Sequence, residues 1–125
     1  GWQRTGNDFL GWTAAGTVPD GAQPVCRFYG TPGRGPNSHF YTASANECAA
    51  VRNDPGWTFE GIAFYALLPN GEQCPGNLQP IYRAYNNRFA QNDSNHRYAS
   101  ELSTLQVMAA QGWTVEGTVF CVPAL

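Results

Sequence analysis

The sequence predicts an α+β fold with mainly antiparallel strands, in which two pseudo-symmetric units of strand–strand–helix–strand order follow a short N-terminal hairpin. The first observation is an internal repeat, because NSHFYTASANECAAVRNDPGWTFEG at residues 37–61 returns as SNHRYASELSTLQVMAAQGWTVEG at residues 94–117. The second is a matched piece before each copy, PVCRFYG from Pro24 and PIYRAYN from Pro80. A repeat of this length marks one structural unit used twice, so residues shared by both copies are first of all scaffold.

Composition is the third observation and limits the class of protein. The 125 residues form one domain, which we divide into residues 1–21, 22–68 and 78–125. Aromatic residues make up 14% and charged residues 13% of the chain, as is typical of a compact, loop-rich β structure. The net charge of −2 argues against binding of nucleic acids or acidic membrane surfaces, which demand a clustered basic face. No stretch approaches the roughly 20 apolar residues of a membrane helix, and we expect a monomer.

Residues 1–21 have two interpretations. GWTAAGTV from Gly11 resembles the Gly-Trp-Thr strands of both units, although Ala15 stands where the units have glutamate. This stretch is therefore either the closing strand of a truncated third unit or part of a leading hairpin with Trp2, Phe9 and Trp12 in the core. No signal peptide is visible at the start, as expected for a domain cut from a longer precursor.

Three strands are predicted in the first unit. Residues 24–30 alternate apolar and polar side chains, and residues 39–43 form a second strand after the turn-rich TPGRGPNS loop. WTFEGIAFYAL from Trp57 and its counterpart from Trp113 are long and apolar, so we expect them to be the central strands. The glycines at 61 and 117 mark a bulge or a close backbone approach. The polar segment PNGEQCPGNLQ links the units.

Each unit contains one predicted helix. A capping box begins the first helix at Ser44, whose hydroxyl accepts from the N–H of Glu47 while the Glu47 carboxylate reaches back. The Asn-Asp-Pro-Gly run at 53–56 ends it, because a residue before proline avoids the helical region. In the second unit Ser100 is the predicted cap and Gly112 the left-handed C-cap. The expected inward-facing residues are Ala45, Cys48, Ala49, Leu102, Leu105 and Ala109.

Four cysteines without a CxxC motif indicate two disulfides rather than a metal site. Cys26 and Cys48 are both absent from the second unit, where Tyr82 and either Thr104 or Leu105 replace them. Residues that disappear together are expected partners, so the predicted disulfides are Cys26–Cys48 and Cys74–Cys121, each worth about 3 kcal/mol. Disulfides predict a secreted or extracellular protein.

Catalytic and metal sites find little support in the sequence. The cysteines are paired, no GxSxG is present, and the only two histidines occupy equivalent positions. Glu60 and Glu116 are the only patterned carboxylates, but symmetry gives them the same environment, whereas a glycosidase pair needs different ones. No metal-ligand spacing occurs. We therefore expect no catalytic residue, no metal and no cofactor.

Aromatic rings with polar neighbours are the remaining chemistry, and they suit a pocket that binds sugar rings. The alternatives for the same residues are core tryptophans, scaffold histidines, and cross-strand salt bridges of Arg27 and Arg83 with the two repeated glutamates. The candidate ligand-binding residues are Arg27, Asn37, His39, Tyr41, Trp57, Glu60, Asn95, His96, Tyr98, Trp113 and Glu116.

Three motifs, repeated in order, connect the chain with a known group of proteins. The pattern P-V-x-R-F-Y, H-F-Y-T-x-S and G-W-x-x-E-G-x-A-F-Y over about residues 22–123 resembles a repeat family of unknown function in secreted bacterial and fungal proteins. The resemblance implies a module, often C-terminal, attached to hydrolases or other extracellular domains, and no established catalytic residue. The second copy departs from the pattern at Arg97, Ala99 and Cys121, so the two units need not bind the same ligand.

These observations favour a non-catalytic accessory module of a secreted bacterial protein that binds a polysaccharide or a cell-surface glycan beside a parent catalytic domain. The first alternative is a structural or protein–protein module of the cell surface without a small ligand. The second is a small glycoside hydrolase that uses Glu60 and Glu116.

Overall fold

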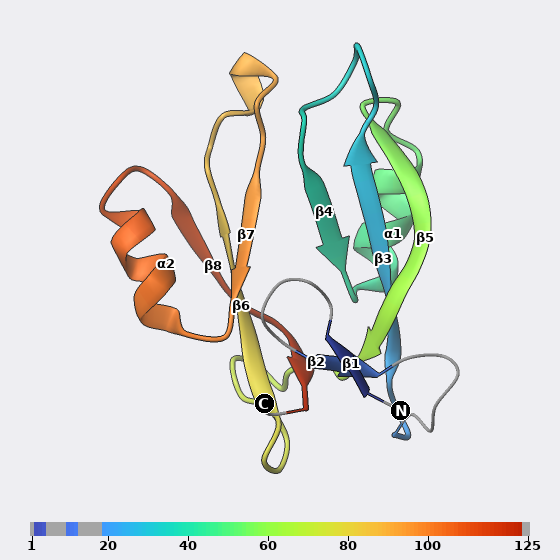
Figure 1. The fold of residues 1–125 in the computed structure, drawn as a ribbon, viewed down its shortest axis with the longest axis vertical. Coiled ribbons are helices and arrows are strands. Elements are labelled where there is room, and N and C mark those ends of the chain that lie inside the picture. The colour runs from blue at the N-terminus through green and yellow to red at the C-terminus, as the bar shows by residue number, and fades with distance from the viewer. Residues whose placement is uncertain (1, 5–9, 13–18, 124–125) are drawn as a thin grey trace.

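The structure, a computed structural model, describes residues 2–4, 10–12 and 19–123 and has an α+β fold (Figure 1). In chain order the elements are β1 (Trp2–Arg4), β2 (Leu10–Trp12), β3 (Gln23–Gly30), β4 (His39–Thr42), α1 (Ala45–Arg52), β5 (Trp57–Ala66), β6 (Gln79–Tyr85), the 3₁₀ helix η1 (Phe89–Gln91), β7 (His96–Ala99), α2 (Leu102–Ala109) and β8 (Thr114–Val122). The predicted α+β class with antiparallel strands is confirmed.

The strands form two antiparallel sheets. Sheet 1 has the order β1-β2-β5-β3-β4 and sheet 2 the order β7-β6-β8. The order strand–strand–helix–strand thus occurs once in each sheet, with η1 added between β6 and β7. Both long strands were expected at the centre, and this is wrong for β8, which lies at an edge of sheet 2. The difference arises at the N-terminus, because β2 covers the outer edge of β5 and the described residues supply no such strand for β8.

The two N-terminal strands lie at the edge of sheet 1, and residues 13–18, which carry most of the GWTAAGTV stretch of the truncated-unit interpretation, lie outside the described residues. β1 and β2 pair antiparallel, with Trp2 opposite Trp12, and β2 joins sheet 1 through Trp12 opposite Tyr65. Trp12 is buried in the core, as expected. The side chain of Trp2 and the whole of Phe9 lie outside the described residues.

Each long strand carries the predicted bulge at its central glycine. Gly61 has φ +103° and Gly117 φ +93°, and the pairing with β3 and β6 shifts by one residue beside each of them. The extra residue in each bulge is the glutamate before the glycine, Glu60 or Glu116. A bulge re-aims the side chain of its extra residue, and here it turns both carboxylates to the arginine of the neighbouring strand.

Both helices are short and differ from the prediction at their start. The Ser44 hydroxyl accepts from the Glu47 N–H at 3.2 Å, as predicted, but the Glu47 carboxylate binds an arginine of sheet 2 instead of reaching back. In α2 the cap is Glu101 rather than Ser100, and its side chain makes no capping hydrogen bond. Only one residue of each helix is buried, Cys48 in α1 and Leu105 in α2. The expected inward residues that are exposed instead are Ala45, Ala49, Leu102 and Ala109.

Both predicted disulfides are present. Cys26–Cys48 fastens α1 to β3, and Cys74–Cys121 fastens the linker between the sheets to β8. The pairing follows the logic of the repeat, because each bond joins residues that the other half lacks. The two bonds close segments of 22 and 47 residues.

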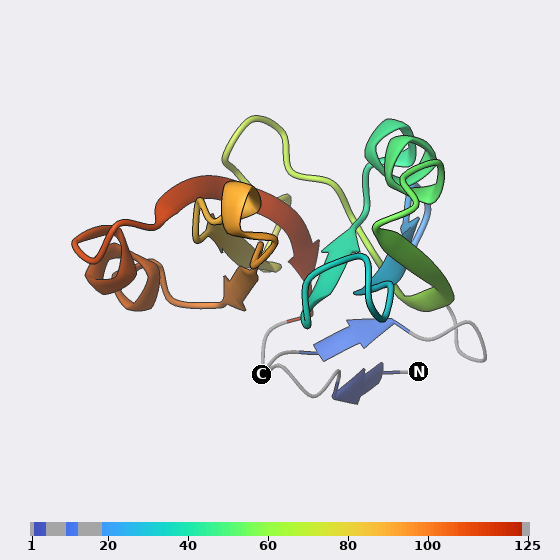
Figure 2. The ribbon, with the colours of Figure 1, turned by 90° about the horizontal axis from the view of Figure 1, so that it is seen from above.

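The sheets meet along β4 and β7, which lie side by side, while α1 and α2 occupy opposite sides of the molecule (Figures 1 and 2). Corresponding residues of the two halves touch across this contact. The rings of Phe64 and Phe120 are 5.6 Å apart, and those of Tyr41 and Tyr98 are also 5.6 Å apart. A backbone bridge between Leu67 and Cys121 closes the lower end. The core cluster here consists of Val25, Ala43, Phe64, Ala66, Ile81, Tyr98, Phe120 and Val122.

The two bulge glycines allow a matched test of the fold. A left-handed φ costs any other residue about 1–3 kcal/mol, so Gly61→Ala should lower the free energy of unfolding by that amount. Gly117→Ala should cost more, because its Cβ would lie 2.6 Å from Glu72 Oε1, which accepts from the Thr118 N–H. Urea unfolding of both variants measures the difference. Equal losses would show that the Glu72 contact contributes nothing.

Candidate functional site

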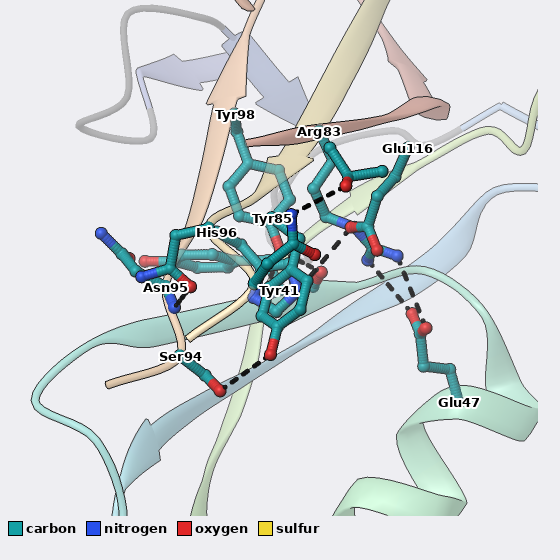
Figure 3. Close-up of polar contacts among 12 residues, drawn as sticks. Tyr41, Glu47, Arg83, Tyr85, Ser94, Asn95, His96, Tyr98 and Glu116 are labelled. Atoms are coloured by element: carbon teal, nitrogen blue, oxygen red, sulfur yellow. Dashed lines mark hydrogen bonds and ion pairs between the residues drawn. The ribbon is translucent and has the colours of Figure 1, made fainter. Parts of the chain in front are cut away.

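A buried cluster centred on Arg83 joins the two sheets (Figure 3). The Arg83 side chain is only 10% exposed, and its Nε lies 2.7 Å from Glu116 Oε1 in the same sheet. Its Nη1 lies 3.2 Å from Glu47 Oε1, which belongs to α1 of the other half. Burial alone would lower the pKa of Arg83, but the nearby phenol of Tyr98 and the two carboxylates raise it above its usual value. The cation is therefore held permanently between the halves.

His96 lies beside this cation and is also largely buried. Its ring is 4.6 Å from the Phe40 ring and stacks on Tyr85 at 4.9 Å. Burial first, and Arg83 second, lower the pKa of His96 to about 4, against a smaller opposing effect of Glu47. The imidazole is thus neutral near pH 7, although its Nε2 lies 3.7 Å from Glu116.

Tyr98 connects the cluster to β4. Its hydroxyl donates to the Tyr41 carbonyl at 2.6 Å and lies 2.8 Å from the Tyr41 N–H, which donates to it. Burial raises the pKa of the Tyr98 hydroxyl well above its ordinary range. Tyr98 is consequently a fixed contact between the sheets, and its hydroxyl is fully engaged there. The name "Arg83 cluster" is used below for Glu47, Arg83, His96, Tyr98 and Glu116.

Sheet 1 carries the same residue types in an open setting. Glu60 Oε1 lies 3.2 Å from Arg27 Nε and 3.2 Å from His39 Nε2. The side chains of Arg27, His39 and Glu60 are 42%, 46% and 34% exposed. The imidazole of His39 packs against the Tyr29 ring at 4.6 Å, as His96 does against Tyr85. The Arg83 cluster of sheet 2 is therefore covered, whereas Arg27, His39 and Glu60 of sheet 1 are accessible to solvent.

A cleft rich in side-chain amides opens where the β6–β7 loop meets the start of β4. Its volume is about 590 Å³, within the range of ligand pockets. Trp113 supplies an aromatic wall, and Arg88 and Asp93 form an ion pair at 2.6 Å beside it. This amide cleft is lined by Asn37, Ser38, Asn86, Asn87, Arg88, Gln91, Asp93, Asn95, Gln111, Gly112 and Trp113.

Hydrogen bonds hold the loop of the amide cleft in one conformation. Asn86 Oδ1 accepts from the N–H groups of Arg88 and Asn95, and Asn86 Nδ2 donates to the Asp93 carbonyl at 2.7 Å. Asn87 has φ +60°, and its Nδ2 donates to the Gly112 carbonyl at 2.9 Å. Non-glycine residues with such a φ are held by their surroundings and occur often at functional sites.

Two further cavities flank the contact between the sheets. The α2 cavity, of about 620 Å³, lies between β4, β7 and α2 and is lined by His39, Tyr41, Asn95, His96, Arg97, Tyr98, Ala99, Ser100, Glu101 and Thr104. The α1 cavity is only about 160 Å³ and is lined by Phe40, Glu47, Val51, Trp57, Arg83, His96 and Glu116. Asn95 lines both the amide cleft and the α2 cavity.

The residues proposed from the sequence are divided among these places. The amide cleft contains Asn37, Asn95 and Trp113, while the α2 cavity contains His39, Tyr41, His96 and Tyr98 together with Asn95. Trp57 and Glu116 line the small α1 cavity, and Arg27 and Glu60 line none of the three. Sequence reasoning missed Asn86, Asn87, Arg88, Gln91 and Gln111. A signal was present, since the run NNRFAQNDSN at residues 86–95 contains five amide side chains.

Metal ligands and membrane spans were sought in the part of the chain that the structure describes. No group of three or more His, Cys, Asp or Glu side chains there could hold a metal ion. No helix there has the length and apolar character needed to cross a membrane.

Acid should loosen the contact between the sheets. The pKa of His96 is about 4 in the folded state, whereas that of a free histidine side chain is about 6.5, so the unfolded state binds the proton more readily. The contribution of neutral His96 is complete above pH 6.5 and is lost as the pH falls towards 4, by about 3 kcal/mol in all. Burial would raise the pKa of Glu47, but hydrogen bonding to Thr42 and Arg83 outweighs this effect, so this pKa is also lowered. Protonation of Glu47 therefore removes further stability at still lower pH.

Urea unfolding of the wild type and His96→Gln between pH 7 and 4 checks this expectation. The wild type should lose stability over that interval, and the variant should lose clearly less. His39→Gln, which removes the imidazole from the same position of the exposed set, is the control. A wild-type stability that stays constant over this interval would contradict the assignment of His96 as a buried neutral imidazole.

Comparison with known proteins places the chain in a family. Searches of the curated proteins and of the solved structures found no match. The family model described as a domain of unknown function (DUF5648) matches residues 1–123, and the chain therefore belongs to this family.

Proposed function

We propose that the protein is a non-catalytic module that binds a polysaccharide through the amide cleft. The observation that carries this proposal is the cleft itself, in which Trp113 and the amides of Asn37, Asn95, Gln91 and Gln111 face one space of about 590 Å³. A sugar ring offers an apolar face of C–H groups and a rim of hydroxyls. The cleft offers one aromatic side chain, Trp113, for the apolar face and several side-chain amides that can hydrogen-bond to the hydroxyls.

Side-chain amides match sugar hydroxyls because each amide presents an acceptor oxygen and two donor hydrogens. A hydroxyl also donates and accepts, so one amide can engage two neighbouring hydroxyls. The charged groups of the cleft, Arg88 and Asp93, neutralise one another in their ion pair. The cleft thus favours neutral, polar ligands.

The rigidity of the loop supports binding as well. The hydrogen bonds of Asn86 and Asn87 fix the loop without a ligand, so little ordering entropy remains to be lost on binding. Phe89 is the first residue of η1 and is 79% exposed, and its neighbours Arg88 and Gln91 line the cleft. An exposed aromatic ring beside a polar cleft is a second surface on which a polymer could stack.

The remaining parts of the proposal concern the chain as a whole. We infer that the two strand–strand–helix–strand halves are copies of one unit, since they share bulges, arginine–glutamate pairs and contacts between corresponding residues. Two disulfides support a secreted protein. A bacterial origin and attachment to a parent catalytic domain follow the resemblance of the repeated motifs.

The two alternatives receive different support. A structural or protein–protein module would explain the Arg83 cluster, whose groups bind one another between the sheets, but not the amide cleft. A glycoside hydrolase would need Glu60 and Glu116 in one cleft. None of the three cavities described above is lined by both glutamates, and each is paired with an arginine of its own sheet.

Affinity electrophoresis against a panel of soluble neutral polysaccharides tests the proposal. At least one polymer should retard the wild type. Trp113→Ala should bind roughly two- to tenfold more weakly, since one aromatic stack is worth about 0.5–1.5 kcal/mol. Gln91→Ala should weaken binding as well.

Arg34→Ala is the matched control, because Arg34 is an exposed residue of the corresponding loop in the first half. Its retardation should equal that of the wild type, and thermal melting should show that all variants are folded. Retardation by none of the polymers, or equal retardation of wild type and Trp113→Ala, would refute binding in the amide cleft.

A further inference from the structure

The geometry points to a second site, in the α2 cavity beside His39, Tyr41 and Arg97, that takes a sugar bearing a carboxylate, that is, a uronic acid unit. This inference deepens the proposed polysaccharide binding and rests on it. Each sheet has a polar face that carries an arginine, a histidine, a glutamate and two tyrosines. Side chains of the other half cover this face in sheet 2, and the corresponding side chains are missing from the same face of sheet 1.

The two faces correspond residue by residue. Both carry an arginine paired with the bulge glutamate, a histidine packed against a tyrosine ring, and a second tyrosine at the contact between the sheets. The corresponding pairs are Arg27 and Arg83, Tyr29 and Tyr85, His39 and His96, Tyr41 and Tyr98, and Glu60 and Glu116.

Two side chains of the first half cover the face of sheet 2. The carboxylate of Glu47 meets Arg83 with both oxygens, at 3.2 and 3.5 Å. The ring of Phe40 lies 4.6 Å from the His96 ring and 5.0 Å from the Arg83 guanidinium. The occupant of this face is therefore a carboxylate beside a flat apolar surface.

Neither group is present at the corresponding positions of the second half. Helix α1 spans residues 45–52 and α2 spans 102–109, with one buried residue each, so Thr104 corresponds to Glu47. Strands β4 and β7 likewise match Arg97 with Phe40. The shorter Thr104 leaves a cavity of about 620 Å³, whereas the covered side retains about 160 Å³.

A uronic acid unit supplies both missing groups in one molecule. Its pyranose ring has an apolar face that can stack on the rings of His39 and Tyr41, which lie nearly parallel at 24° and 6.1 Å apart. Its carboxylate can meet an arginine as Glu47 meets Arg83. Arg97 lines the cavity, and Arg27 is the cross-strand neighbour of Tyr41, which also lines it. Arginine suits this role because its planar fork of donors matches a carboxylate.

The charge balance agrees with this assignment. On the covered face, one arginine meets two carboxylates and a neutral histidine. On the open face, Arg27 pairs with Glu60. Arg97 and Glu101 in the lining of the α2 cavity add one charge of each sign, so one further carboxylate gives the same net charge as on the covered face. The charged groups of the open face are Arg27, Glu60, Arg97 and Glu101.

The position of the second site also suits a polymer. Asn95 lines both the amide cleft and the α2 cavity, so the two adjoin at the start of β7. One chain could occupy both, and two linked contacts raise the overall affinity through effective concentration. The expected ligand is thus an acidic polysaccharide in which neutral and uronic acid units alternate or follow one another.

Calorimetric titration with oligouronates and their carboxyl-reduced, neutral counterparts tests the inference. For at least one uronate, the wild type should bind the acidic form tighter than the neutral form by roughly tenfold or more, as expected for hydrogen bonds to a charged group. Thr104→Glu, which restores the carboxylate of the first half, should abolish this preference by weakening binding of the acidic form to the level of the neutral form or below.

Two controls separate the possible outcomes. Thr104→Gln has the size of glutamate without its charge and should keep a preference for the acidic form. Thr104→Glu should fold at least as well as the wild type, because an acidic residue suits the first turn of a helix. Trp113→Ala should weaken binding of neutral and acidic forms by the same factor, whereas Thr104→Glu should weaken binding of the acidic forms by a much larger factor than binding of the neutral ones.

Equal affinity of the wild type for the acidic and neutral forms would overturn the uronate site and leave the amide cleft intact. The proposed function itself would be refuted if the protein bound no neutral oligosaccharide and Trp113→Ala did not change its binding of the acidic ones. The assignment to a sugar would be overturned if the protein bound a short peptide containing phenylalanine and glutamate but none of the uronates. In that case Thr104→Glu should prevent binding of the peptide.

Discussion

The arrangement of the whole molecule depends on the neutralisation of one buried cation. Arg83 is the central charge of the contact between the sheets, and a buried guanidinium is tolerated only when it is paired and hydrogen-bonded. One carboxylate, Glu116, comes from a bulge in the same sheet, and the other, Glu47, comes from the first helix of the other half. Because each partner is delivered by a different element, the ion pairs fix how the two sheets lie relative to one another.

The neighbours of this cation acquire their properties from the same contact. His96 is neutral because it is buried beside a permanent positive charge, and Tyr98 keeps its proton because burial outweighs the attraction of that charge. The same residue types in sheet 1 lie at the surface, where His39 is 46% exposed. Identical chemistry thus serves as internal structure in one half and as accessible surface in the other.

Local signals in the sequence predicted the elements of the fold but not the contacts between halves. The bulges at Gly61 and Gly117 and both disulfides follow from patterns within one unit or from comparison of the two copies. The partner of Glu47 could not be predicted in this way, because the capping pattern gives it a local role and only the folded chain brings Arg83 near. Part of the amide cleft was missed for a related reason. Asn86, Asn87, Arg88 and Gln91 come from the loop between β6 and β7, which the repeat does not share, and comparison of copies draws attention to what they have in common.

The difference between the two halves reduces to a small number of side chains. Glu47 and Phe40 of the first half cover the polar face of the second, whereas Thr104 and Arg97 leave the polar face of the first uncovered. Had both halves kept the glutamate and the aromatic ring, both faces would be filled from within and neither would be open to a ligand. Had neither kept them, Arg83 would lack one of its two carboxylates inside the molecule. One closed face therefore holds the halves together, and the loss of the same two groups from the other copy provides the space in which a ligand can replace them.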